Sequence, residues 1–263
     1  MIVCERTNPQ FEEDLGRGLR WLRRLTYPLA DAVTVQGDDM APAFRALAPG
    51  MKHVEVLPNP LPGALNKGQQ EPSLEKANPP RLIAMGRLSR EKQFAEFIAS
   101  FGLLAAEFPD WELWLWGEGP MRPQLEQQVR EAGLDRRVFL PGTTTEPWKE
   151  LTKGAVFVLS SAYEGFPNVL LEAMALGLPC VAFDCPSGPR TLTRGGQDGL
   201  LVPAGDGSAL TAALRRVMGD AALRLELGKR AAVSVRERYT LDKVLPLWDA
   251  LFASVISQRK AIQ

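Results

Sequence analysis

Residues 155–177 of this chain read AVFVLSSAYEGFPNVLLEAMALG and predict a strand, a loop and a helix in that order. The apolar run 155–159 is typical of a buried strand, and residues 160–166 are expected to form the loop at its carboxyl end. Pro167 suits the first position of the helix, and Gly177 predicts where the helix stops. Glu164 therefore falls in the loop, and Glu172 falls about a turn and a half into the helix.

The two carboxylates flank the start of this helix. The unpaired backbone N–H groups there form an electropositive patch that favours a phosphate. Carboxylates on both sides of such a patch suit a ligand that carries a diphosphate and many hydroxyls, which describes a nucleotide sugar. The alternative is a chance pair of glutamates beside an ordinary strand–loop–helix unit, because two glutamates at this spacing are common.

The sequence EGFPNVLLEAMA, which contains the two glutamates, resembles the E-x7-E motif of the retaining glycosyltransferases of family 4. These enzymes have the two-domain GT-B fold. The resemblance implies that Glu164 binds hydroxyls of the donor sugar and that Glu172 binds the ribose. It also implies that backbone amides of the intervening loop and helix start assist them. Those residues are Gly165, Phe166, Pro167, Asn168 and Val169.

Composition excludes several other classes of protein. Lys+Arg and Asp+Glu both number 31, so the chain lacks the basic excess that a nucleic-acid partner usually requires. The three cysteines (Cys4, Cys180, Cys185) form no C-x-x-C pair, and we expect reduced thiols in a cytoplasmic protein. No apolar run reaches the length of a membrane span, and no signal-peptide pattern opens the chain.

Strand-like and helix-like segments alternate along the chain, which is typical of βαβ units and a parallel sheet. We therefore expect an α/β fold that is GT-B-like, with a doubly wound parallel-sheet domain in the second part of the chain. Strands are predicted at 81–85, 112–116, 138–140, 155–159, 180–183 and 199–202. Helices are predicted at 92–108, 121–132, 167–176, 208–218, 221–239 and 241–257.

The domain organisation expected from these segments has four parts. Residues 1–62 are interpreted as the remnant of an N-terminal, acceptor-side Rossmann-like domain, with strands at 2–4, 32–35 and 54–57 and helices at 11–25 and 39–48. Residues 63–80, rich in polar residues and proline, are the linker. Residues 81–240 form the nucleotide-sugar-binding domain, and 241–263 a helix that returns toward the first domain. Compared with the family, about 100 residues of the first domain are expected to be missing. We therefore expect the chain as given to have little or no transferase activity.

A second motif, GRLSREK, follows the first strand of the second domain at residues 86–92. Gly86 lets a ligand approach the backbone, and Arg87 and Lys92 provide cations that stabilise the charge of a departing diphosphate. The segment resembles the family's G-R-L…E-K motif, whose Arg and Lys grip the diphosphate. A solvated helix start with scattered charges is the alternative. The family often has Gly after the Lys, where this chain has Gln93.

Two glycine turns also follow predicted strands. Gly117 and Gly119, in WGEGP, are similar to the family's G-x-G-P turn and are expected to let the nucleotide pass close to the backbone. An ordinary strand-to-helix turn is an equal alternative. Gly142 opens a loop, with Thr143 and Thr144, whose backbone by resemblance meets the base.

Two further patterns have a structural and a functional interpretation. Trp111, Trp114, Trp116 and Trp148 could stack on sugars, but their position in or beside strands favours core packing. The predicted helix 11–25 has an apolar side formed by Phe11, Leu15, Leu22 and Leu25 and a basic side formed by Arg17, Arg20, Arg23 and Arg24. Such a helix can lie on anionic lipid at the inner face of the membrane, but we expect a core-facing helix with its arginines in solvent.

Together the motifs favour a retaining glycosyltransferase that moves a hexose or N-acetylhexosamine from a UDP-linked donor to a saccharide or lipid-linked acceptor, as in surface polysaccharide synthesis. Glu164, Arg87 and Lys92 would carry the chemistry without a metal, since no Asp-x-Asp pair stands at a strand end. The alternatives are a non-catalytic nucleotide-sugar-binding fragment, a related sugar-nucleotide epimerase, or a phosphorylase.

Overall fold

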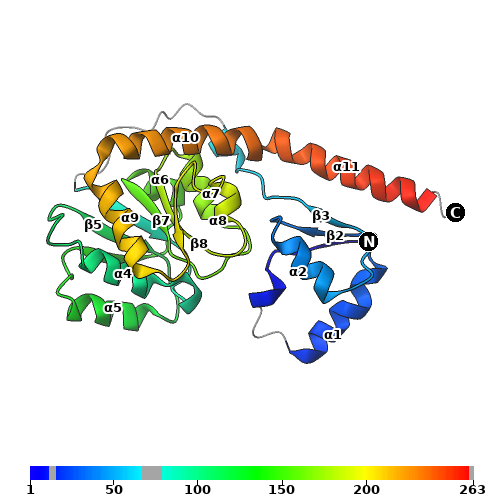
Figure 1. Ribbon diagram of the computed structural model, residues 1–263, viewed down its shortest axis with the longest axis horizontal. Coiled ribbons are helices and arrows are strands. Elements are labelled where there is room, and N and C mark those ends of the chain that lie inside the picture. The colour runs from blue at the N-terminus through cyan, green and yellow to red at the C-terminus, as the bar shows by residue number, and fades with distance from the viewer. Residues whose placement is uncertain (12–15, 67–78, 261–263) are drawn as a thin grey trace.

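The computed structural model describes residues 1–11, 16–66 and 79–260 and contains two parallel β-sheets (Figure 1). The first sheet has the strand order β1-β2-β3 and the second the order β6-β5-β4-β7-β8-β9. The α/β architecture expected from the sequence is confirmed. The strands are β1 (Ile2–Cys4), β2 (Ala32–Val35), β3 (Val54–Val56), β4 (Arg81–Met85), β5 (Glu112–Trp116), β6 (Val138–Gly142), β7 (Val156–Leu159), β8 (Cys180–Asp184) and β9 (Leu200–Pro203).

The second sheet is doubly wound, and its strand order reverses between β4 and β7. From β4 the chain builds outward to β5 and β6, and it then returns to place β7 on the other side of β4. All of these pairings are parallel, so the carboxyl ends of the strands lie along one edge. In such sheets ligands bind outside that edge, at the point of reversal.

Helices cover both faces of the second sheet, because alternate strand residues face opposite sides. Leu82 and Val156 pack with the helices on one face, and Ile83 and Phe157 pack with those on the other. The first face is covered by α4 (Phe94–Gly102), α5 (Arg122–Glu131) and α9 (Gly207–Gly219). The second is covered by α6 (Pro147–Thr152), α7 (Asn168–Ala175) and α10 (Ala221–Tyr239).

The first sheet has a separate small core. Val33 and Val35 of β2 pack with Phe44 of α2 (Met40–Leu47). Helix α11 (Leu241–Lys260) runs back beside this sheet (Figure 1). There Leu251 packs with Ala32 and Leu57. The other elements are α1 (Arg17–Thr26), α3 (Gly63–Asn66), α8 (Pro189–Leu192) and the 3-10 turns η1 (Pro9–Phe11), η2 (Tyr27–Leu29) and η3 (Arg90–Lys92). No helix in the described ranges is long and apolar enough to cross a membrane.

The structure contradicts two local predictions. Pro167 is the N-cap of α7 and not its first helical residue. The core-facing interpretation of helix 11–25 is also wrong. Its helical part is α1, and Leu22 and Leu25 are 53% and 57% exposed. Residues 12–15 of that prediction and residues 67–78 of the predicted linker lie outside the described part of the chain.

Replacing Gly228 of α10 by alanine should destabilise the fold. A Cβ there would lie 2.1 Å from the carbonyl oxygen of Gly177, at the end of α7, and two backbones would have to separate. The expected loss is about 1–3 kcal/mol in the free energy of unfolding, measured by urea denaturation. Gly219→Ala in α9 is the matched control, because its nearest neighbour would be the Phe108 ring at 3.9 Å. Equal midpoints for the two variants would contradict the packing described for α7 and α10.

Candidate functional site

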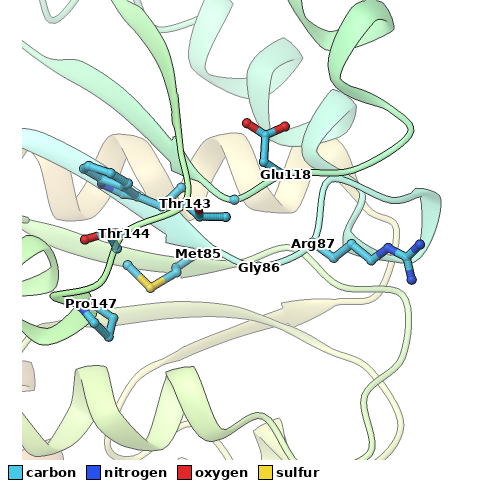
Figure 2. A pocket seen from close by; sticks show the side chains of 9 residues that line it. Met85, Gly86, Arg87, Glu118, Thr143, Thr144 and Pro147 are labelled. Carbon is cyan, nitrogen blue, oxygen red and sulfur yellow. The ribbon is translucent and has the colours of Figure 1, made fainter.

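A cavity of about 290 Å³ lies at the carboxyl ends of β4, β5 and β6 (Figure 2). Small-molecule sites begin at about this size. Figure 2 shows Arg87 extending away from Met85, Thr144 and Pro147. The lining residues are Met85, Gly86, Arg87, Trp116, Gly117, Glu118, Thr143, Thr144 and Pro147. The cavity thus joins the GRLSREK motif to the two glycine turns that follow β5 and β6.

The glycines after β5 have a structural role in addition to the one predicted. A Cβ on Gly117 would lie 1.9 Å from the carbonyl oxygen of Gly86, and one on Gly119 would lie 2.3 Å from that of Leu88. The loops after β4 and β5 continue to pair, since Gly86 N–H donates to Trp116 O at 2.9 Å. The neighbouring backbone therefore requires glycine at both positions, and Gly117 also lines the cavity, so the approach of a nucleotide there stays a prediction. Gly142 does not line it, and its carbonyl accepts the Gly117 N–H at 2.8 Å.

Lys92 and Glu164, which the sequence assigned to separate parts of the donor, form an ion pair. Lys92 Nζ lies 2.7 Å from Glu164 Oε1, which also accepts the Ser161 hydroxyl at 2.6 Å. Both side chains are largely buried. A lysine ammonium has three N–H donors, so Lys92 can hold Glu164 and still donate to an oxyanion. The aliphatic stem of Lys92 lies against Gly86, at the rim of the cavity.

Gln93, at the position where the family often has glycine, adopts a left-handed backbone conformation. Its φ of 48° and ψ of 37° are left-handed, and it joins η3 to α4. A non-glycine residue is strained there. Gln93 Oε1 is in addition buried without a hydrogen-bond partner among the described residues. The loop that presents Lys92 therefore keeps its shape at a cost in stability.

Glu172 lies on α7, and its carboxylate is held by a tryptophan. Trp148 Nε1 donates to Glu172 Oε2 at 3.1 Å. Burial raises the pKa of the Glu172 carboxyl, and the hydrogen bond from Trp148 opposes the shift. Trp148 belongs to α6, whose first residue, Pro147, lines the cavity. Glu172 is thus connected to the cavity through α6.

The loop between the two glutamates is packed by the first part of the chain. A Cβ on Gly165 would lie 2.0 Å from the carbonyl oxygen of Arg6, so only glycine fits there. Asn168 Oδ1 accepts from Asn59 Nδ2 at 2.9 Å. Residues that follow β1 and β3 therefore reach the start of α7.

The side chains of the remaining loop residues pack inside the protein, so mainly their backbone groups could contact a ligand. Phe166 is buried with its ring edge-on to Tyr239, Val169 packs against the core, and Pro167 fills the space beside Gly188. The Asn168 N–H, one of the amides expected to cradle a phosphate, instead donates to Phe166 O at 2.8 Å.

Sequence reasoning missed three contributors. Trp116 lines the cavity and Trp148 holds Glu172, and both also pack against the core as predicted. Ser161 was not singled out. Its position three residues before Glu164 in the same loop was the available signal. In the described ranges, no group of three or more His, Cys, Asp or Glu side chains could hold a metal ion.

The arrangement places two cations beside the cavity, and one of them, Lys92, contacts a carboxylate. Arg87 is exposed at the cavity, and Lys92 follows with Glu164 beyond it. Preorganised cations stabilise negative charge that develops on a leaving group. Burial raises the pKa of the nearby Cys185 thiol to about 12, with the charge of Glu164 adding to the shift, so this thiol stays protonated.

Comparison with known proteins gives one family match. A model described as Glycosyl transferases group 1 matches residues 79–220. The chain is 32% identical over 226 residues to the lipopolysaccharide core biosynthesis glycosyltransferase LpsD of Rhizobium meliloti, which is 84% of this chain and 63% of that protein. It is 30% identical over 214 residues to the lipopolysaccharide 1,6-galactosyltransferase of Salmonella typhimurium, which is 80% of this chain and 57% of that one. The chain therefore spans less than two thirds of the length of these relatives.

Among solved structures, the fold is similar to TarM of S. aureus, crystallised in complex with fondaparinux, α-GlcNAc-glycerol and UDP. The TM-score is 0.83 at 20% sequence identity, over 95% of this chain and 50% of that one. This similarity confirms that the described sheets and helices have the arrangement found in GT-B glycosyltransferases.

Gln93→Gly should stabilise the protein, because glycine accepts the left-handed conformation and removes the unpaired Gln93 Oε1. The expected gain is about 1 kcal/mol in the free energy of unfolding, measured by denaturant titration. Gln127→Gly, in the right-handed helix α5, is the matched control and should lose about 1 kcal/mol. A loss of similar size in both variants would show that the backbone at Gln93 is not strained.

Glu172→Gln should stabilise the protein at neutral pH and change little at acidic pH. Because the pKa of Glu172 is raised in the folded state, its protonated form contributes stability below the unfolded-state pKa, and that stability is lost as the pH rises through the folded-state pKa. Glutamine removes the buried charge and keeps an acceptor for Trp148. Thermal unfolding at about pH 4 and about pH 8 measures the effect. A Tm difference that does not change with pH would contradict it.

Proposed function

This chain belongs to the group 1 family of glycosyl transferases, and on that basis we propose that it moves a hexose or N-acetylhexosamine from a UDP-linked donor to a saccharide or lipid-linked acceptor. The role would be in the synthesis of surface polysaccharide, as the names of its relatives indicate for them. The relatives are longer than this chain, so the activity is proposed for the protein that contains it.

One observation carries the proposal. A cavity of nucleoside size opens beside Arg87, and the Lys92–Glu164 pair lies on the next loops of the same sheet edge. Base, diphosphate and sugar follow each other in that order along a nucleotide sugar. The residues therefore offer an apolar and hydroxyl-lined cavity, then cations, then a carboxylate, in the order in which the ligand needs them.

Each part of the donor is assigned to named groups. The base would enter the cavity beside Thr143 and Thr144, and the ribose hydroxyls would donate to Glu172. Arg87 and Lys92 would bind the diphosphate, with Gly86 and Gly117 forming the cavity wall. Glu164, held by Lys92 and Ser161, would accept from hydroxyls of the sugar. This assignment treats Glu164 and Glu172 as the E-x7-E pair of family 4.

We propose retention of configuration without a metal. Arg87 and Lys92 would stabilise the departing diphosphate, and the acceptor hydroxyl would attack the same face of the sugar as the phosphate leaves. No protein nucleophile is then needed, and a chelator should leave the transfer rate unchanged.

We also propose that different segments of the chain bind the acceptor and the donor. Residues 1–62 would belong to the acceptor side, 63–80 to a linker and 81–240 to the donor side, with 241–263 returning to the first part. The separate cores of the two sheets support this division. A cytoplasmic protein in peripheral contact with the inner face of the membrane would meet lipid-linked acceptors there.

Variants of the cation pair test the donor site by calorimetry with UDP. Arg87→Ala and Lys92→Gln should each raise the Kd by about 10- to 150-fold, which corresponds to one charge-assisted hydrogen bond. Glu172→Gln should have a smaller effect, because a neutral acceptor makes about half as strong a bond. Glu164→Gln should leave UDP affinity unchanged and reduce the preference for a UDP-sugar over UDP.

Arg90→Ala is the matched control, since Arg90 is exposed on the same loop and does not line the cavity. Unchanged UDP affinity in both Arg87→Ala and Lys92→Gln would refute the donor site. Conversion of the UDP-sugar without an acceptor would indicate an epimerase, and the absorbance of pyridoxal in the purified protein would indicate a phosphorylase.

A further inference from the structure

Asp39 lies at the start of helix α2, but its carboxylate does not cap that helix. The residue is the N-cap of α2, a position where aspartate ordinarily accepts a hydrogen bond from an N–H of its own helix. Within the described residues, no N–H of α2 makes this bond. Asp39 Oδ2 instead accepts the backbone N–H of Ser187, which lies 148 residues away in the loop between β8 and α8. A bond that would stabilise α2 is thus exchanged for one that holds a loop of the second sheet.

Ser187 depends on this support because its backbone is strained. Its φ is 70°, in the left-handed region that favours glycine. The residue is buried, and its hydroxyl oxygen accepts a second hydrogen bond from Asn8 Nδ2 at 3.0 Å. A strained conformation persists only where its surroundings enforce it. Asp39 and Asn8, which follow β2 and β1, supply side chains that enforce it here.

The Ser187 loop in turn contacts the loop that carries Glu164. Pro186 O accepts the Glu164 N–H at 3.1 Å. A Cβ on Gly188 would lie 2.4 Å from Cδ of Pro167, so these two loops are also in close contact on the other side of Ser187. The two neighbours of Ser187 therefore fix both ends of the segment 164–167.

Other contacts from the first part of the chain converge on the same segment. The Phe11 ring stacks on the ring of Tyr163, which directly precedes Glu164, with the centroids 4.9 Å apart and the planes 7° apart. The Arg6 carbonyl fits against Gly165, which directly follows Glu164. Both neighbours of Glu164 thus touch the first part of the chain, so the position of Glu164 depends on that part as well as on its own sheet.

We propose that Asp39 is a positioning residue for the donor sugar. By accepting the Ser187 N–H, it fixes the loop that binds the Glu164 backbone, and it thereby orients the Glu164 carboxylate toward the sugar hydroxyls. The proposal rests on the role proposed above for Glu164, and it adds a residue of the first part of the chain to the donor site. Because Asp39 acts through Ser187 and not on the nucleotide, its loss should weaken recognition of the sugar and leave the binding of UDP unchanged.

Calorimetry of the whole chain with UDP and UDP-sugars tests the proposal. The probe is whichever of UDP-glucose, UDP-galactose and UDP-N-acetylglucosamine the native chain binds most tightly. The measured quantity is the sugar ratio, which is the Kd for UDP divided by the Kd for that UDP-sugar. Asp39→Ala should lower the sugar ratio about tenfold, the size of one lost hydrogen bond to a carboxylate, at an unchanged Kd for UDP. Asp39→Asn keeps an oxygen acceptor and should retain most of the ratio.

Asp39→Ser separates positioning from folding. Serine is a favoured N-cap, so α2 should stay as stable as in the native chain, but its side chain is too short to reach Ser187. The sugar ratio should therefore fall in this variant as it does in Asp39→Ala, while the Tm stays near the native value. Asp38→Ala is the matched control, because Asp38 is exposed on the same loop and the variant loses the same charge.

A second background tests whether the strained backbone transmits the effect. Glycine adopts the left-handed conformation without support, so in the Ser187→Gly background Asp39→Ala should change the sugar ratio by less than about twofold. A contact that only stabilises the fold would lower the Tm without changing the sugar ratio in either background.

Three results would overturn the positioning role and leave the donor site intact. One is an unchanged sugar ratio in both Asp39→Ala and Asp39→Ser, in a chain that binds UDP. Another is an equal loss in Asp38→Ala, because the charge and not the bond to Ser187 would then be responsible. The third is a full tenfold loss in the Ser187→Gly background. A native chain that binds no UDP would instead refute the donor site, and the role of Asp39 with it.

Discussion

The parallel pairing of β4 with both β5 and β7 is the constraint on which the rest of this structure depends. It brings the loops after three neighbouring strands to one edge, although they come from residues near 87, 117 and 164. The loops after β4 and β5 remain paired beyond the sheet, where Gly117 and Gly119 admit the carbonyl groups of Gly86 and Leu88. Part of the cavity wall is therefore backbone held by hydrogen bonds, which sets its shape before any ligand arrives.

The loop that carries Glu164 is a junction between distant parts of the chain. Lys92 reaches it from the loop after β4, and Pro186 O accepts the Glu164 N–H from the loop after β8. Arg6 and Asn59 reach it from the first sheet. A movement of the first sheet would thus displace the loop that carries Glu164, the residue proposed to hold the donor sugar. This gives a physical route by which the two sheets can act together.

Two residues near the cavity lower the stability of the fold. Gln93 is in a left-handed conformation with an unpaired side-chain oxygen, and Glu172 is a carboxylate whose burial raises its pKa. In most of a protein, the local preference of the sequence agrees with the packing of the fold. Strain and buried charge that gather on the loops and helices around one cavity are typical of functional sites, where the surrounding structure over-determines an unfavourable geometry. The pattern agrees with the site that the sequence motifs indicated.

The sequence by itself determined the fold class and most strand positions. It also determined the loops that carry Arg87, Lys92 and Glu164 and the helix that carries Glu172, because these follow from local periodicity and from turn residues. Only the tertiary structure showed that Lys92 pairs with Glu164 and that Trp148 donates to Glu172. It also showed why glycine is required at positions 117 and 165. These depend on contacts between segments far apart in sequence, which periodicity does not encode. It also decided the orientation of α1. The pattern correctly marked an amphipathic helix, but it did not predict that Arg23 contacts Glu5 and Tyr27 while Leu22 and Leu25 are exposed. Periodicity identifies the two sides of a helix, whereas its neighbours decide which side faces the core.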